Sequence, residues 1–352
     1  MEELCNNVDN TRIRPSTFHL KSDAEKGAFL FEKPFLSTSE KIALLKKRGL
    51  CFTEEEEEEG FIANILETVG YYRLSGYFHF YYRDDLDDST QHIFRQNTRF
   101  KDVYTIYQLD EQVRQILLDA LFKIEISLKT RLDLELCNFG KSQNEPFPEL
   151  WYLKEAHFKD TKEFSSCFHQ VCNDMEFNEK EPRHPFIASF KYKYEDQFPP
   201  SWMIVETLMF GTLSKIIEKL KRSHRKDIAK HYGYHSDKDF VKAVNALGNL
   251  RNISAHHGRV WNREFGIVPP VIYAFDEFRE NAQDGKHDYT FSNRRIAHFY
   301  LIIRYFHQHI SDNTSFTEQF KVWYQKVPDD LRSYLGFRHP IEYYDKYPLA
   351  TN

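Results

Sequence analysis

The chain has 352 residues, of which 41% are hydrophobic and 16% aromatic, so it is long and apolar enough to bury a large core. Gly and Pro number only 13 each, which argues against an all-β sandwich with many turns and favours helices. The formal net charge is −5, and the five cysteines include no C-x-x-C pair. An odd count without such pairs argues against a disulfide framework and a structural zinc site.

The N-terminal segment lacks the basic and apolar regions of a signal peptide, and no stretch approaches the ~20 apolar residues of a membrane span. We therefore expect a cytoplasmic protein without membrane contact. No motif calls for a metal or another cofactor.

Hydrophobic periodicity predicts an all-α fold. Residues 1–32 show weak periodicity and are expected to form an N-terminal arm. A helix is predicted over Ser39–Lys47, with Ser37 or Ser39 as its N-cap, and another over Glu55–Val69.

The middle of the chain contains the strongest periodic pattern, from Asp102 to about Leu136, which predicts a helix roughly 50 Å long. Before it, the aromatic segment Tyr71 to Asp84 fits either a strand-like hairpin arm or a buried helix and turn. After it, the stretch from Gly140 to Glu181 is expected to be rich in loops. A single helix is predicted after the prolines, Pro199 to Lys221.

Two charged pairs lie within the predicted long helix. Asp110 and Arg114 are spaced i,i+4, and so are Glu125 and Lys129. This spacing is typical of surface ion pairs.

The second half of the chain continues the helical pattern. Ser236 to Asp239 matches an S-x-x-D capping signature that starts a helix running toward His256 and stopping near Gly258. Other helices are predicted over three ranges, Lys226–Tyr232, Asn293–Ser311 and Phe316–Gln325. We expect one compact unit with three subregions after the arm, namely 33–100, a core at 101–265 and a C-terminal extension at 266–352.

Positive charge is concentrated between Thr212 and Arg263, where twelve Lys and Arg face four acidic residues, an excess of +8. Local excess, rather than net charge, is what a phosphate backbone responds to. A solvated, lysine-rich helix surface is the alternative interpretation.

The stretch LRNISAHHGRVWNR, Leu250 to Arg263, contains the pattern R-N-x-x-x-H. Metal-free RNA cleavage requires a group of near-neutral pKa to move the 2′-hydroxyl proton, which histidine supplies. It also requires a fixed cation for the phosphate, which arginine supplies. The pattern therefore predicts His256 and Arg251 as catalytic. Asn252 is four residues before His256, so it is expected to orient the imidazole.

Further phosphate contacts are predicted from four residues, His257, Arg259, Arg263 and Lys242. His257 competes with His256 for the catalytic role, but its position before Gly258 favours a helix-capping role. Arg251 lies about 140° around the helix from His256, so either its side chain bends or a second copy of the helix completes the site. By itself, the pattern also fits a structural Arg–His pair.

Several blocks, in order, resemble the Abi-like proteins of the AbiD/AbiF type, which are bacterial phage-defence factors. The blocks are KPFLSTSEKIALLKKRGL (Lys33 to Leu50), YYRLSGY (Tyr71 to Tyr77), YQLDEQVRQILLDALFKIEISLKTRL (Tyr107 to Leu132), PPSWMIVETLMFGTLS (Pro199 to Ser214) and RNISAHHGRVWNR.

This resemblance implies a HEPN-like helical bundle, a homodimer and metal-independent RNA cleavage that leaves 2′,3′-cyclic phosphate and 5′-hydroxyl ends. It assigns Arg251 and His256 as catalytic and Asn252 as supporting. Three further positions match the family without an assigned role: Glu125, Trp202 and Glu206. The implied partners are an RNA substrate and a regulatory non-coding RNA or antitoxin. The alternatives are a non-catalytic module that binds such an RNA or antitoxin, and an assembly partner in a defence complex.

Overall fold

The computed structural model describes residues 34–52, 56–83, 92–176, 182–196, 198–267, 269–270, 294–310 and 314–346. The predicted N-terminal arm lies outside these ranges. Within them, all regular structure is helical, and only isolated bridges pair extended residues. The predicted all-α class is confirmed.

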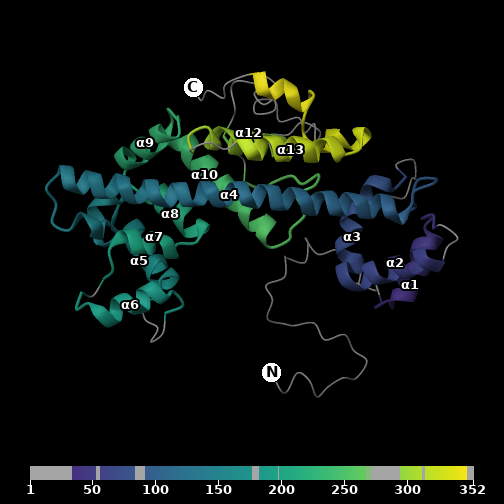
Figure 1. The fold of residues 1–352 in the computed structure, drawn as a ribbon, viewed down its shortest axis with the longest axis horizontal. Helices are drawn as coiled ribbons and strands as arrows, with labels where there is room; N and C mark the ends of the chain where they lie inside the picture. The colour runs from purple at the N-terminus through teal and green to yellow at the C-terminus, as the bar shows by residue number, and fades with distance from the viewer. Residues whose placement is uncertain are drawn as a thin grey trace, which may run out of the picture.

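A single helix, α4 (Phe100–Ser142), runs along the whole length of the molecule (Figure 1). Its 43 residues correspond to about 65 Å, so the predicted helix extends further at both ends. Four shorter helices pack along it, namely α3 (Tyr71–Phe78), α10 (Asp237–Ala255), α12 (Ile296–His307) and α13 (Thr314–Lys326). Because its neighbours lie on several sides, α4 buries residues along its whole length, Phe100 through Gly140.

The N-terminal helices lie at one end of α4 (Figure 1). Helix α1 (Thr38–Lys47) begins with a capping box between Ser37 and Glu40, which confirms Ser37 as its N-cap. Helix α2 (Glu56–Ile65) continues through a π-helical turn at Leu66–Gly70 into α3 (Tyr71–Phe78). The first half of the aromatic segment is therefore a helix, because Leu74, Tyr77 and Phe78 all point into the core.

The region between Gly140 and Glu181 is more ordered than predicted. It contains α5 (Thr161–Asp174), whose N-cap Asp160 accepts a hydrogen bond from the Glu163 amide at 2.9 Å. Helix α6 (Pro185–Lys193) follows. The sequence signals for α5 were this acidic cap and the i, i+3, i+4, i+7 spacing of its apolar residues, Phe164, Cys167, Phe168 and Val171.

The predicted single helix after Pro199 is wrong, because two helices form there, α7 (Ser201–Thr207) and α8 (Phe210–Lys219). The break follows from a tertiary contact. The Asp174 carboxylate of α5 accepts a hydrogen bond from the Met209 amide at 3.1 Å, and Leu208 is extended. The remaining helices match the prediction within a few residues, namely α9 (Arg222–His231), α10 (Asp237–Ala255), α12 (Ile296–His307) and α13 (Thr314–Lys326).

The two charged pairs of α4 are buried, so their prediction as surface ion pairs is wrong. Asp110 has no exposed surface. Its Oδ2 accepts hydrogen bonds from Tyr77 Oη and Arg114 Nη1, each at 2.5 Å. Its Oδ1 accepts from the amides of Val260 (3.1 Å) and Trp261 (2.7 Å). One carboxylate thus joins α3, α4 and the turn that follows α10.

Replacement of Asp110 by Ala should lower the free energy of unfolding by roughly 3 kcal/mol or more, because Arg114 would remain buried without its counter-ion. The matched control is Asp119→Ala on the same helix, whose ion pair with Lys123 (3.0 Å) is half exposed. That change should cost less than about 1 kcal/mol. Urea denaturation measures both, and equal losses would contradict the central role of Asp110.

Candidate active site

The R-N-x-x-x-H motif occupies the last turn and a half of α10. The helix ends with His256 as its C-cap, and His257 follows in the left-handed conformation (φ 57°). The His257 amide donates to the Ser254 carbonyl at 3.2 Å, and the Gly258 amide donates to the Ile253 carbonyl at 2.7 Å. These two bonds form a Schellman motif, so the predicted capping role of His257 is confirmed.

Arg251 is held from α4. Its Nε lies 3.5 Å from Oε2 of Glu125, and its guanidinium carbon lies 5.9 Å from the centre of the Phe122 ring. Only 26% of the Arg251 side chain is exposed. Glu125 is also paired with Lys129 (3.6 Å). The Nε atom is buried and faces Glu125 without a hydrogen bond, so the donors that a phosphate can reach are on the Nη side of the guanidinium.

Asn252 and His256 are both exposed at the end of α10. The Asn252 Oδ1 accepts a hydrogen bond from Arg251 Nη1 at 3.4 Å. Among the described residues, none makes a hydrogen bond to the His256 ring. The motif therefore combines a cation fixed by a buried carboxylate with an imidazole that is open to solvent.

The turn after α10 is clasped by α3, a contact that the sequence did not predict. Arg73 Nη1 donates to the His257 carbonyl at 2.6 Å, across 184 positions of the chain. In return, Arg259 Nη1 donates to the Gly76 carbonyl at 2.8 Å. The sequence pointed to the YYRLSGY block as a family feature, but it did not indicate which part of the chain this block contacts.

The other residues that were predicted to contact phosphate do not all lie near the motif. Arg259 and Arg263 lie beside the motif, and Arg263 Nη1 donates to the Arg259 carbonyl at 3.3 Å. Lys242 pairs with Asp239 (3.8 Å) and lies about 21 Å along α10 from His256, so it is not part of the same cluster. Two cations of the basic segment are neutralised by carboxylates from outside it, Lys219 by Glu163 and Arg251 by Glu125.

The two other family positions lie on α7. The Glu206 side chain is exposed, and its main-chain carbonyl accepts from Lys129 Nζ at 3.3 Å. Trp202 is also exposed. Glu206 thus meets the Glu125–Lys129 pair through its backbone.

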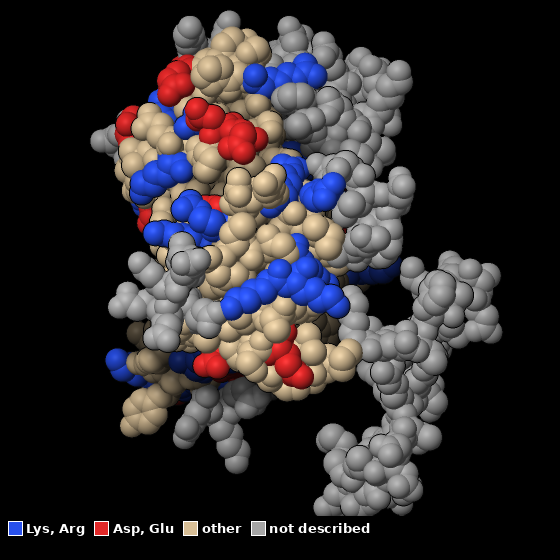
Figure 2. Space-filling view, turned by 90° about the vertical axis from the view of Figure 1, so that its right-hand side faces the viewer, with Lys and Arg blue, Asp and Glu red and all other residues tan. Residues whose placement is uncertain are grey.

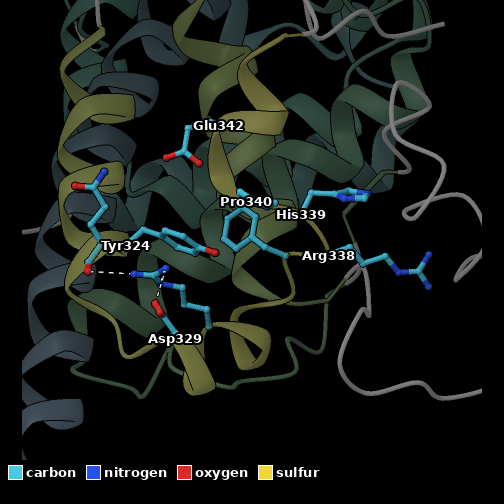
Figure 3. Close-up of a pocket in the computed structure, with 9 residues that line it drawn as sticks. Tyr324, Asp329, Arg338, His339, Pro340 and Glu342 are labelled. Atoms are coloured by element: carbon cyan, nitrogen blue, oxygen red, sulfur yellow. Dashed lines mark hydrogen bonds and ion pairs between the residues drawn. The ribbon is translucent and has the colours of Figure 1, made fainter.

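Other polar clusters lie apart from the motif. A cavity of about 280 Å³ is lined by residues from 324 to 342, among them Tyr324, His339 and Glu342 (Figure 3). Its central cation, Arg332, is already paired with Asp329 at 2.7 Å. A second cluster joins the buried rings of His157 and His224 (3.3 Å), and burial lowers the pKa of His224 to about 4. No group of side chains in the described ranges has the arrangement of a metal site.

The described part of the chain is thus an all-α protein with an R-N-x-x-x-H motif at the end of a helix that packs on one long central helix. Residues 64–262, more than half of the chain, match the family model of the Abi-like proteins. The chain therefore belongs to the Abi-like protein family. Searches of curated proteins and of solved structures find no match. None of the described helices has the length and apolar content that a membrane span needs.

The Schellman motif predicts opposite effects on the free energy of unfolding for substitutions at two adjacent residues, His257 and Gly258. His257→Gly should leave the free energy of unfolding unchanged or raise it by up to about 1 kcal/mol, because glycine adopts positive φ without strain. Gly258→Ala should lower it, because the new Cβ would lie 2.9 Å from Ile253 Cγ2 and 3.0 Å from the Ile253 carbonyl oxygen. Thermal and urea denaturation test both. A stabilised Gly258→Ala variant would contradict this geometry.

Proposed function

We propose that this chain is a metal-independent RNA endonuclease of the HEPN type that acts in bacterial abortive infection. Membership of the Abi-like family supports the defence role. The observation that carries the chemistry is the pairing of a fixed Arg251, anchored by buried Glu125, with a solvent-open His256 five positions later. The protein is expected to act in the cytoplasm.

The proposed reaction is an internal phosphoryl transfer. The imidazole of His256 accepts the 2′-hydroxyl proton while O2′ forms a bond to phosphorus. The P–O5′ bond breaks, and the leaving oxygen takes a proton from a second acid, which yields 2′,3′-cyclic phosphate and 5′-hydroxyl ends. Arg251 stabilises the charge on the phosphoryl oxygens. Asn252, which bonds to Arg251, keeps the guanidinium in place.

A homodimer would supply the second acid as the other copy's histidine. Exposed apolar side chains occur on α4, on the adjoining α7 and at the N-cap of α8. We call them the apolar strip: Phe122, Ile126, Leu134, Trp202 and Met209. The strip begins at Phe122, under the Arg251 guanidinium. Exposed apolar side chains that gather on one surface are typical of a protein–protein contact. A symmetric contact over it would bring two motifs together.

The alternative proposal is an RNA-binding module without catalysis, held with a regulatory non-coding RNA or an antitoxin. The half-buried cations Arg259 and Arg263 beside the motif would serve either role. An exposed imidazole at the C-cap favours the nuclease, because a binding module gains little from a titratable group there.

Cleavage can be tested with purified protein, total tRNA and mRNA in the presence of EDTA. Wild type should cut the RNA and leave cyclic-phosphate ends. Arg251→Ala and His256→Ala should each lower the rate at least 100-fold, because a general acid–base group alone contributes about 10²–10⁴-fold. His169→Ala, which removes an exposed histidine on α5 outside the motif, serves as the control and should retain activity. RNA binding without cleavage by wild type would favour the alternative proposal.

The proposed dimer can be tested by sedimentation at increasing concentration. Ile126→Glu should shift the protein to a monomer and reduce cleavage, because it places a charge within an apolar contact. Val322→Glu is the matched control, since Val322 is a similarly exposed apolar residue on α13. Equal dimer content in both variants would show that the apolar strip is not the dimer contact.

A further inference from the structure

Helix α3 presents one unusual aromatic residue beside the motif. Tyr72 is 92% exposed, whereas the neighbouring Tyr77 and Phe78 are buried. It precedes Arg73, whose guanidinium donates to the His257 carbonyl. His257 directly follows His256, the proposed acid–base residue. A fully exposed tyrosine ring therefore lies on the helix that holds the end of the motif.

The exposed face of α3 carries cations as well as rings. Tyr72, Gly76 and His79 are spaced i, i+4 and i+7, so they share one face of the helix. Arg259 lies over this face, because its guanidinium bonds to the Gly76 carbonyl and Gly76 has no side chain in the way. His79 packs edge-on against Tyr82 (5.5 Å). The face thus presents Tyr72, the Arg259 guanidinium and the His79 ring in a row.

The surface at this end of the molecule carries both signs of charge. In Figure 2, which views the end that carries α1 to α3, Lys and Arg side chains form one row across the lower part, and elsewhere they lie among Asp and Glu side chains. Single-stranded RNA is bound by this combination of flat rings, on which bases stack, and cations that follow the backbone. A duplex keeps its bases stacked on one another and has no use for an exposed ring.

We propose that Tyr72 and Arg73 form a binding site for an unpaired nucleotide next to the scissile phosphate. The base stacks on the Tyr72 ring, and the Arg73 guanidinium binds the adjoining phosphate. This inference rests on the proposed function and narrows the substrate to single-stranded RNA. Cleavage through the 2′-hydroxyl needs a nucleotide that can rotate out of a helix, and a stacking ring beside the motif would hold it there.

Binding is measured by fluorescence anisotropy with the full chain carrying His256→Ala, so that the RNA stays intact. The probes are a labelled 15-nucleotide single strand of mixed sequence and the same strand paired with its complement. Tyr72→Ala should weaken binding of the single strand about 5- to 100-fold, the range for loss of one stacked base. Tyr72→Phe, which keeps the ring, should stay within about twofold. Arg73→Gln should reduce the slope of log affinity against log salt by about one.

The matched control is Tyr192→Ala, because Tyr192 on α6 is 91% exposed and α6 lies at the opposite end of the molecule (Figure 1). Equal affinities of Tyr72→Ala and Tyr192→Ala would overturn the stacking site while leaving RNA binding in place. Equal affinity for duplex and single strand would overturn the substrate class. Absence of any RNA binding or cleavage by wild type would instead overturn the proposed function itself.

A second measurement does not depend on a variant at Tyr72. A single strand containing 5-iodouridine is irradiated with the His256→Ala protein, and the crosslinked peptide is identified by mass spectrometry. A crosslink to Tyr72 supports the site. Crosslinks that map only outside α3 would overturn it.

Discussion

The buried carboxylate of Asp110 is the constraint on which the site depends. Burial raises the pKa of this carboxyl, while Arg114, Tyr77 and two backbone amides favour its charged form. These four donors come from three separate parts of the chain and converge on the one carboxylate. The amides of Val260 and Trp261 belong to the turn directly after the motif. A single charge within the central helix therefore holds in place the turn that follows α10.

The two proposed catalytic groups are held to different degrees. Arg251 is fixed between Glu125 and Phe122, whereas His256 is exposed on the last residue of its helix. This difference suits the proposed chemistry, because a cation that stabilises a transition state benefits from preorganisation, whereas an acid–base group has to exchange protons with water. Glu125 also reduces the positive charge that Arg251 offers, so the phosphate would draw further charge from Arg259 and Arg73.

Prediction from sequence succeeded where structure is decided locally. The Ser236 cap, the three- and four-residue periodicity of α4 and the end of α10 at His257–Gly258 each depend on residues within one or two turns. It failed where a distant group intervenes. The break between α7 and α8 follows from the Asp174 carboxylate. Helix α5 is a different case, because its own residues carry both a cap and an apolar three- and four-residue spacing, and it also packs on α8.

The sequence by itself determined the all-α class, the motif R-N-x-x-x-H and its place at the end of a capped helix, because periodicity and capping are properties of neighbouring residues. Only the tertiary structure decided what surrounds the motif. The carboxylate that holds Arg251 comes from Glu125, and the guanidinium that holds the turn comes from Arg73, 184 positions before His257. An acidic and a basic residue four positions apart form the same ion pair on an exposed helix and on a buried one. The burial of the pairs made by Asp110 and Glu125 was therefore decided by the helices that enclose α4.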